Sequence, residues 1–140
     1  MPRMNFVLTD MDGLFADLEG RVREIMSLEY PRVRLPRPED RKTFYIDEQI
    51  APEHRHLVAQ IIAREGFFLS LKPIPGAVEA LKMIASLDNV DLSICTSPLR
   101  DTRFCIREKY EWVRRVFGES YVEKMILTRD KTQIVADYLL

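Results

Sequence analysis

Short apolar runs alternate with helical patterns along most of this chain. The runs span residues 6–8, 90–95, 125–127 and 138–140. Each run has the length of a buried strand. Apolar side chains recur at helix-face spacing over residues 77–85 and 106–117, and Gly118 follows the second stretch as a C-terminal cap. Strands that alternate with helices predict an α/β fold with a parallel sheet and right-handed crossovers.

The stretch from residue 18 to residue 70 departs from this alternation. It is too long for an ordinary connection between two strands. Its front part carries several prolines, whereas residues 57–62 have an amphipathic helical pattern that Gly66 closes. We therefore expect a small helical cap over residues 18–70, inserted after the first strand of a core made of residues 1–17 and 71–140.

Polar side chains follow each of the first three predicted strands. They are Asp10 and Asp12 after the first, Thr96 and Ser97 after the second, and Arg129 and Lys131 after the third. Ligands of parallel α/β sheets bind beyond the carboxyl ends of the strands. The pattern therefore predicts that these side chains surround one site.

Asp10 and Asp12 are two residues apart in a DxDG turn, so both can face one small volume. Two such carboxylates repel each other unless a cation or a shared proton relieves them. Mg²⁺ suits these oxygens, because it binds a few carboxylates together with waters and substrate phosphate oxygens. One acid could then attack phosphorus while the other serves as general acid and base. The alternative to a catalytic role is an acidic turn that only ends the strand.

The segment around Pro98 also has two interpretations. Proline favours the first turn of a helix, so the Thr96 and Ser97 hydroxyls could hold an anion at a helix start. Taken alone, Ser97 is typical of a helix N-cap. Lys131 would attract a phosphate about 4 Å away by roughly 4 kcal/mol at an effective dielectric of 20, before desolvation.

Composition narrows the class of partners. The 140 residues are 46% hydrophobic and 31% charged, which describes one domain with a modest insertion. A net charge of −1 gives no bulk reason to bind nucleic acid or an anionic membrane, and no apolar run is long enough for a membrane span. Cys95 and Cys105 fit neither a zinc pattern nor a disulfide framework, so we expect a cytoplasmic protein.

The ordered set of DxD, Ser or Thr, and Lys resembles the first three motifs of the haloacid dehalogenase-like phosphohydrolases. Longer segments resemble the 5'(3')-deoxyribonucleotidases within that superfamily, and the similarity covers essentially the whole chain. These segments are DMDGLFADL (10–18), FFLSLKPIPGA (67–77), ICTSP (94–98), EKYEWV (108–113) and ILTRDKT (126–132). The resemblance implies a Rossmann-like core with a helical cap, and Mg²⁺-dependent removal of phosphate from nucleoside 5'- or 3'-monophosphates, preferably deoxy forms.

The resemblance also implies roles for single residues. Asp10 would be the nucleophile and a metal ligand, and Asp12 the acid/base with its backbone carbonyl on the metal. Phosphate would be held by Thr96, Ser97 and Lys131, with Arg129 on the phosphate side. The base and sugar would meet Phe44, Tyr45, Ile46 and Phe68, and also Leu18, which stands where the family usually has a phenylalanine.

One departure concerns the last segment. The family continues past the strand equivalent to residues 138–140 into two acids that complete the Mg²⁺ site, so we expect a C-terminally truncated core. An unpaired sheet edge invites dimerisation, which leaves open a catalytically impaired nucleotide-binding module or a homodimer. A receiver-type phosphoacceptor domain is a third alternative, but it has no insertion like residues 18–70.

Overall fold

The computed structural model describes residues 2–100 and 103–140. Its centre is a parallel sheet with the spatial order β3-β2-β1-β4. The strands are β1 (Asn5–Thr9), β2 (Val90–Thr96), β3 (Ile126–Leu127) and β4 (Tyr138–Leu139). Along β1 and β2 the register runs from Asn5 opposite Val90 to Thr9 opposite Ile94. All three strand pairings are parallel, so the predicted α/β class is confirmed.

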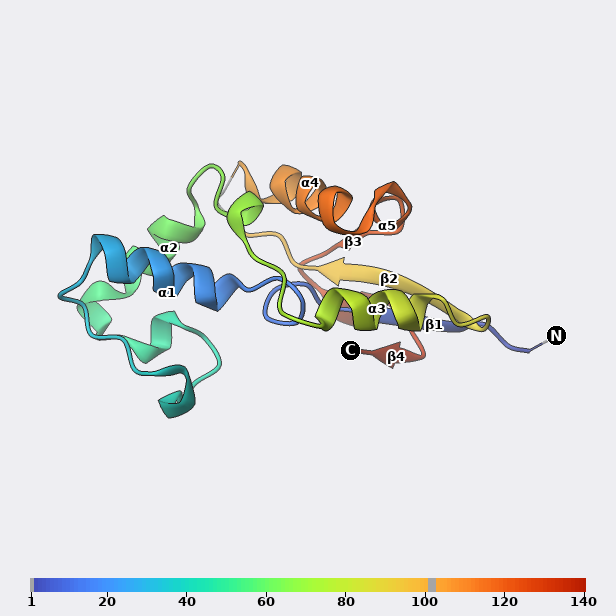
Figure 1. The fold of residues 1–140 in the computed structure, drawn as a ribbon, viewed down its shortest axis with the longest axis horizontal. Helices are drawn as coiled ribbons and strands as arrows, with labels where there is room; N and C mark the ends of the chain where they lie inside the picture. The colour runs from blue at the N-terminus through green and yellow to red at the C-terminus, as the bar shows by residue number, and fades with distance from the viewer. Residues whose placement is uncertain (1, 101–102) are drawn as a thin grey trace.

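Helices flank this sheet (Figure 1). They are α3 (Ala77–Ala85), α4 (Cys105–Phe117) and the short α5 (Glu119–Val122). Gly118 ends α4 with a φ of 101°, a backbone region that favours glycine. The predicted C-terminal cap is therefore confirmed.

The segment that follows β1 forms the helical cap at one end of the molecule, away from the sheet (Figure 1). It contains α1 (Leu18–Glu29) and α2 (Arg55–Ile62), which contact each other. Asp17 caps α1, because its side chain accepts a hydrogen bond of 2.9 Å from the Gly20 N–H. The structure also has short 3-10 helices, at Pro38–Asp40, Asp47–Gln49, Pro52–His54, Phe68–Ser70 and Lys131–Gln133.

The chain passes between cap and sheet through two segments that pair with each other. The Asp17 N–H donates to the Lys72 carbonyl at 2.9 Å, and Ala16 forms a bridge with Pro73. We call these paired segments, residues 15–17 and 72–74, the neck. Because the two segments of the neck are hydrogen-bonded to each other, the chain enters and leaves the cap at neighbouring positions.

Trp112 of α4 is the largest fully buried side chain. Its indole N–H donates to the Leu71 carbonyl at 2.9 Å. Its ring lies 5.8 Å from that of Phe15 and 6.5 Å from that of Phe117, centroid to centroid. One tryptophan thus joins α4 to the turn after β1 and to the end of the cap.

Two sequence interpretations around α4 are wrong. The predicted apolar stripe began at Ile106, yet this side chain is 48% exposed, while Glu108 and Lys109 are buried. Ser97 is not a helix N-cap, because residues 97–100 are not helical and α4 begins at Cys105. Its carbonyl instead accepts a hydrogen bond from the Lys109 ammonium at 3.0 Å, which holds the segment in an irregular conformation.

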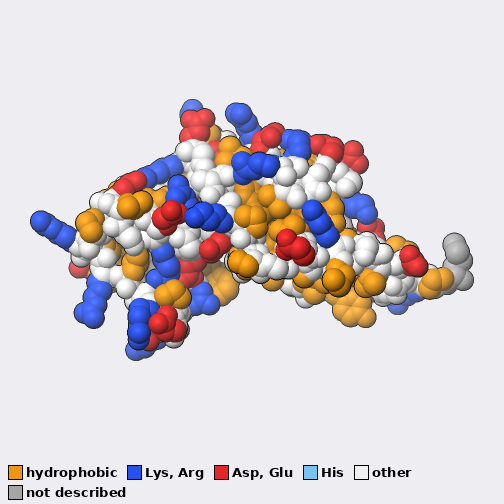
Figure 2. Space-filling view, in the orientation of Figure 1, with side chains coloured by type: hydrophobic (Ala, Val, Ile, Leu, Met, Phe, Trp, Pro, Cys, Tyr) orange, Lys and Arg blue, Asp and Glu red, His pale blue; other side chains and the backbone are white. Residues whose placement is uncertain are grey.

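The surface carries both signs of charge. Figure 2 shows acidic and basic side chains interspersed over the cap on this face, in keeping with the net charge of −1. Within residues 2–100 and 103–140, no helix combines the length and apolar character that a membrane crossing requires.

Candidate active site

Asp10 lies at the carboxyl end of β1, where the sequence places the first acid. Its Oδ1 accepts hydrogen bonds from the Met11 N–H at 2.8 Å and from the Lys131 ammonium at 2.8 Å. Lys131 reaches Asp10 from a 3-10 turn after β3, across 121 positions of sequence. The fold therefore brings together two of the residues that the strand-end pattern selected.

The turn that carries Lys131 is held by its neighbours. Asp130 caps the turn by accepting hydrogen bonds from the N–H and the hydroxyl of Thr132. These hydrogen bonds lower the pKa of Asp130, with the Thr132 hydroxyl as the largest cause. A charged cap of this kind fixes the start of the turn and with it the position of Lys131.

Asp12 is held by a lysine that sequence reasoning missed. The Lys109 ammonium donates to Asp12 Oδ2 at 2.7 Å, to Thr96 Oγ1 at 2.8 Å and to the Ser97 carbonyl at 3.0 Å. Lys109 stands within the EKYEWV segment, which carries part of the resemblance but no predicted role at the site. Only its tertiary partners show that it belongs to the site.

Each aspartate keeps one oxygen uncommitted. Asp12 Oδ1 has no hydrogen-bond partner and almost no exposed surface, and no described donor reaches Asp10 Oδ2. Carboxylate and carbonyl oxygens are the donors that Mg²⁺ takes, and this ion completes its shell with water and phosphate oxygens. In the described part of the chain, no group of three or more His, Cys, Asp or Glu side chains could hold a metal ion. The described residues thus fit an ion with no more than two carboxylate ligands among them.

A cleft of about 760 Å³ extends from the two aspartates to the cap. Four residues proposed for substrate contact line it, namely Leu18, Phe44, Tyr45 and Ile46. The rings of Phe44 and Tyr45 pack edge to face with centroids 5.2 Å apart, and both side chains are exposed. Arginines at positions 41, 55 and 100 add positive charge to the wall. Glu19, which pairs with Arg41 at 2.7 Å, and Asp47 also line the cleft, so Arg55 and Arg100 are the cations left to attract an anionic ligand between the acidic end and the aromatic wall.

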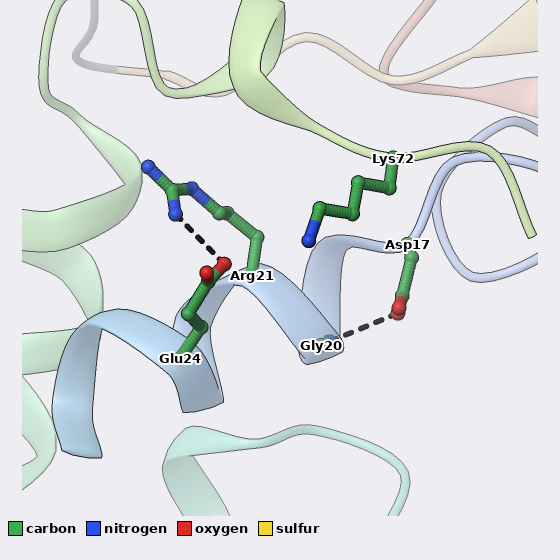
Figure 3. A pocket seen from close by; sticks show the side chains of 5 residues that line it. All are labelled: Asp17, Gly20, Arg21, Glu24 and Lys72. Carbon is green, nitrogen blue, oxygen red and sulfur yellow. Dashed lines mark hydrogen bonds and ion pairs between the residues drawn. The ribbon is translucent and has the colours of Figure 1, made fainter. Parts of the chain in front are cut away.

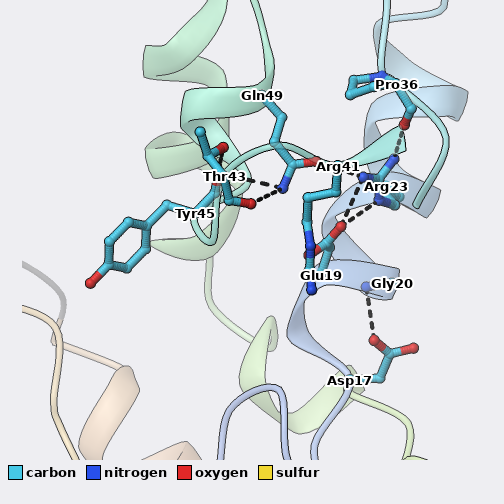
Figure 4. Close-up of polar contacts among 9 residues, drawn as sticks. All are labelled: Asp17, Glu19, Gly20, Arg23, Pro36, Arg41, Thr43, Tyr45 and Gln49. Atoms are coloured by element: carbon cyan, nitrogen blue, oxygen red, sulfur yellow. Dashed lines mark hydrogen bonds and ion pairs between the residues drawn. The ribbon is translucent and has the colours of Figure 1, made fainter. Parts of the chain in front are cut away.

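A polar network fixes the loop that carries this aromatic wall (Figure 4). Arg23 of α1 donates to Glu19 at 2.9 Å, to the Pro36 carbonyl at 2.5 Å and to the Gln49 side chain at 2.9 Å. The amide of Gln49 in turn donates to the Tyr45 carbonyl at 3.5 Å. The loop is therefore tied to α1 through side chains that lie outside the cleft or at its rim.

Other predicted site residues do not reach the cleft directly. Phe68 has no exposed surface and is not part of the wall, so its ring cannot stack on a ligand in this conformation. Thr96 is buried with its hydroxyl bound to Lys109. Ser97 and Arg129 are exposed but do not line the cleft.

Cys95 is the other potential nucleophile near the acids. Burial raises the pKa of its thiol, and the negative charge of Asp10 raises it further, while Lys131 lowers it. The thiol therefore stays protonated at neutral pH and is a poor nucleophile. Both cysteines are free and buried.

A second, smaller cavity of about 220 Å³ lies beside the first turns of α1 (Figure 3). Its wall combines Asp17, Gly20, Arg21, Glu24 and Lys72. Arg21 and Glu24 form an ion pair of 2.8 Å, and the hydrogen bond from Arg21 lowers the pKa of Glu24. None of the predicted site residues lines this cavity.

Residues 3–140 match the protein family described as "5' nucleotidase, deoxy (Pyrimidine), cytosolic type C protein". The chain is 42% identical over 137 residues to the mitochondrial 5'(3')-deoxyribonucleotidase of Mus musculus, covering 96% of this chain and 62% of that protein. It is 39% identical over 143 residues to the cytosolic type of Homo sapiens, with coverage of 100% and 71%. A haloacid dehalogenase-like family hydrolase from Xanthomonas campestris has a TM-score of 0.46 at 11% identity, with coverage of 94% and 65%. The chain thus spans about three fifths of the length of the mitochondrial relative.

Proposed function

The chain belongs to the 5'(3')-deoxyribonucleotidase family, and we propose that it hydrolyses deoxyribonucleoside 5'- or 3'-monophosphates with Mg²⁺ as cofactor. One observation carries this proposal: two aspartates, each paired with its own lysine, line one cleft together with the aromatic loop of the cap. The acids supply the chemistry for a phosphate ester, and the loop supplies a surface for a base. A cytoplasmic location remains our prediction, in keeping with two unpaired cysteines.

Asp10 is the nucleophile in this proposal. Its Oδ1 is committed to Met11 and Lys131, so Oδ2 is the oxygen that attacks phosphorus. The Oδ2–phosphorus bond forms while the bond from phosphorus to the nucleoside oxygen breaks, which gives an aspartyl-phosphate. The Lys131 ammonium reduces the repulsion between the carboxylate and the incoming phosphate.

Asp12 moves the protons. It gives a proton from its carboxyl group to the departing nucleoside oxygen, and the nucleoside leaves as an alcohol. In the second half-reaction Asp12 takes a proton from a water molecule that attacks phosphorus. The bond between phosphorus and Asp10 Oδ2 then breaks, which releases inorganic phosphate and restores both acids.

Asp10, through its carboxylate, and Asp12, through its backbone carbonyl, are the residues that would hold Mg²⁺. When bound, the ion would act as a Lewis acid that neutralises charge on the phosphoryl oxygens. Two cations of the cleft wall, Arg55 of the cap and Arg100 of the segment after β2, attract the same anionic group.

Release of inorganic phosphate from dUMP tests the proposal directly. We expect release by the full chain in Mg²⁺ and its loss when EDTA removes the metal, because the two carboxylates repel a phosphate without a cation between them. Excess Mg²⁺ added after EDTA is the control and should restore the rate. Calorimetric binding of dUMP without any release of phosphate would favour instead a catalytically impaired nucleotide-binding module.

Tyr45→Ala should weaken substrate binding more than chemistry. Stacking of a base on an aromatic ring is worth about 1 to 3 kcal/mol, so KM for dUMP should rise roughly 5- to 140-fold with kcat little changed. Deoxyribose 5-phosphate, which has no base, should show no such change in KM. Met83→Ala, at an exposed position of α3 outside the cleft, is the matched control. An unchanged KM for dUMP would remove Tyr45 from the base-binding surface.

A further inference from the structure

Lys109 is a buried cation, and each N–H donor of its ammonium group has an acceptor. An ammonium group has three N–H donors. Three acceptors surround this one: Asp12 Oδ2, Thr96 Oγ1 and the Ser97 carbonyl oxygen, at 2.7, 2.8 and 3.0 Å. The side chain has no exposed surface. Burial of a charge is strongly unfavourable unless its partners are well placed, so this arrangement fixes the position of each acceptor.

The neighbouring residue anchors the same turn of α4 to the end of the cap. Glu108 is buried, and its two carboxylate oxygens accept the N–H groups of Gly66 at 2.6 Å and of Phe68 at 3.1 Å. The ring of Phe68 lies under the ammonium of Lys109, 5.1 Å from Nζ to the ring centroid. Phe68 is thus held by its backbone N–H, and its ring packs against the Lys109 ammonium in a cation–π contact.

These contacts determine how Asp12 is presented. Lys109 binds Oδ2, and the second oxygen, Oδ1, is buried without a hydrogen-bond partner, so Lys109 sets the orientation of the carboxylate. Without Lys109 the carboxylate could rotate about its side-chain bonds, and either oxygen could turn away from the cleft. A proton donor must lie within hydrogen-bond reach of the leaving oxygen to be effective.

We propose that Lys109 is a positioning residue that holds Asp12 by Oδ2 and so keeps its carboxyl group in place for proton transfer to the leaving oxygen. The proposal rests on the proposed function, since it assigns the orientation of the acid in that reaction. Glu108 and Phe68 fix Lys109 in turn, which makes α4 the support of the acid. A buried lysine that only stabilises the fold is the competing interpretation.

The dependence of the reaction rate on the leaving group distinguishes a positioning role of Lys109 from a purely structural role. We expect Lys109→Met to lower kcat for dUMP by about 100-fold, because an alkoxide leaving group needs its proton from Asp12. The pre-steady-state burst of 2,4-dinitrophenolate from 2,4-dinitrophenyl phosphate reports the first half-reaction alone, and this leaving group needs no proton, so the burst rate should change less than about threefold. Asp12→Asn should give the same pattern, and the double variant should be no slower than Asp12→Asn alone. Lys124→Met, at an exposed lysine that pairs with Asp91 just before β3, is the matched control and should leave both rates unchanged.

Equal losses on the two esters would overturn the proposal in favour of a structural role. A second measurement does not depend on turnover: the Nζ resonance of Lys109 in isotope-labelled protein should shift in Asp12→Asn and stay unshifted in Asp91→Asn. An Nζ resonance that does not respond to Asp12→Asn would overturn the proposal, also where Lys109→Met fails to fold. If the unmodified chain releases phosphate from neither ester, the proposed function fails, and the Nζ shift still decides whether Lys109 holds Asp12.

Discussion

We expect Asp10→Asn to reduce phosphate release from dUMP by at least about 10³-fold. The amide keeps the shape of the carboxylate but is not a nucleophile, and loss of an attacking group removes a whole step rather than one contact. The measurement is a steady-state phosphate assay in Mg²⁺ with the full chain. The fold should be unaffected, because the Asp10 side chain is 46% exposed and an amide oxygen can still accept from Lys131.

The matched control for this variant is Asp91→Asn. Asp91 lies in β2 opposite Phe6, at the amino end of the strands, and pairs with Lys124 on the surface. The two substitutions change charge by the same amount, but only one lies in the cleft. A rate that survives Asp10→Asn would exclude Asp10 as the nucleophile. A rate that falls equally in both variants would indicate a general effect of charge.

Trp112→Ala should lower the free energy of unfolding by about 3 to 5 kcal/mol, because it leaves a large cavity in a closely packed core. Trp112→Phe should cost about 1 to 3 kcal/mol, since it leaves the buried Leu71 carbonyl without its donor. Trp112 is the only tryptophan, so urea unfolding must be followed by circular dichroism rather than by intrinsic fluorescence.

Ile106→Ala is the control on the same helix. This side chain is 48% exposed, so its loss should change the free energy of unfolding by no more than about 0.5 kcal/mol. A large effect at Ile106 together with a small effect at Trp112 would mean that α4 presents the opposite face to the core.

The sheet and its polar edge were predictable because they follow from local signals. Each strand is a short apolar run that ends at polar residues, and parallel strands necessarily present these ends at one edge. The pairing of Asp10 with Lys131 therefore needed no knowledge of distant contacts. The aromatic loop at Phe44 and Tyr45 came only from the resemblance, since two exposed rings have no periodic pattern.

Lys109 and Glu108 could not be found from periodicity. A rule that places charged side chains outside the core assigns both to solvent. They are buried because each finds complementary partners from segments far away in the sequence: Asp12 and Thr96 for the lysine, and the Gly66 and Phe68 N–H groups for the glutamate. The same tertiary contacts explain why Ser97 is not a helix N-cap. Its carbonyl accepts a hydrogen bond from Lys109, and the segment around it is not helical.

The neck also makes the molecule modular. Its two segments are joined by a hydrogen bond of 2.9 Å from the Asp17 N–H to the Lys72 carbonyl, so the cap begins and ends at practically the same point. A different cap grafted between these two residues would need to span almost no distance and would leave the sheet edge with its aspartates intact. Chimaeras made at this junction could exchange ligand preference while they retain the phosphate chemistry.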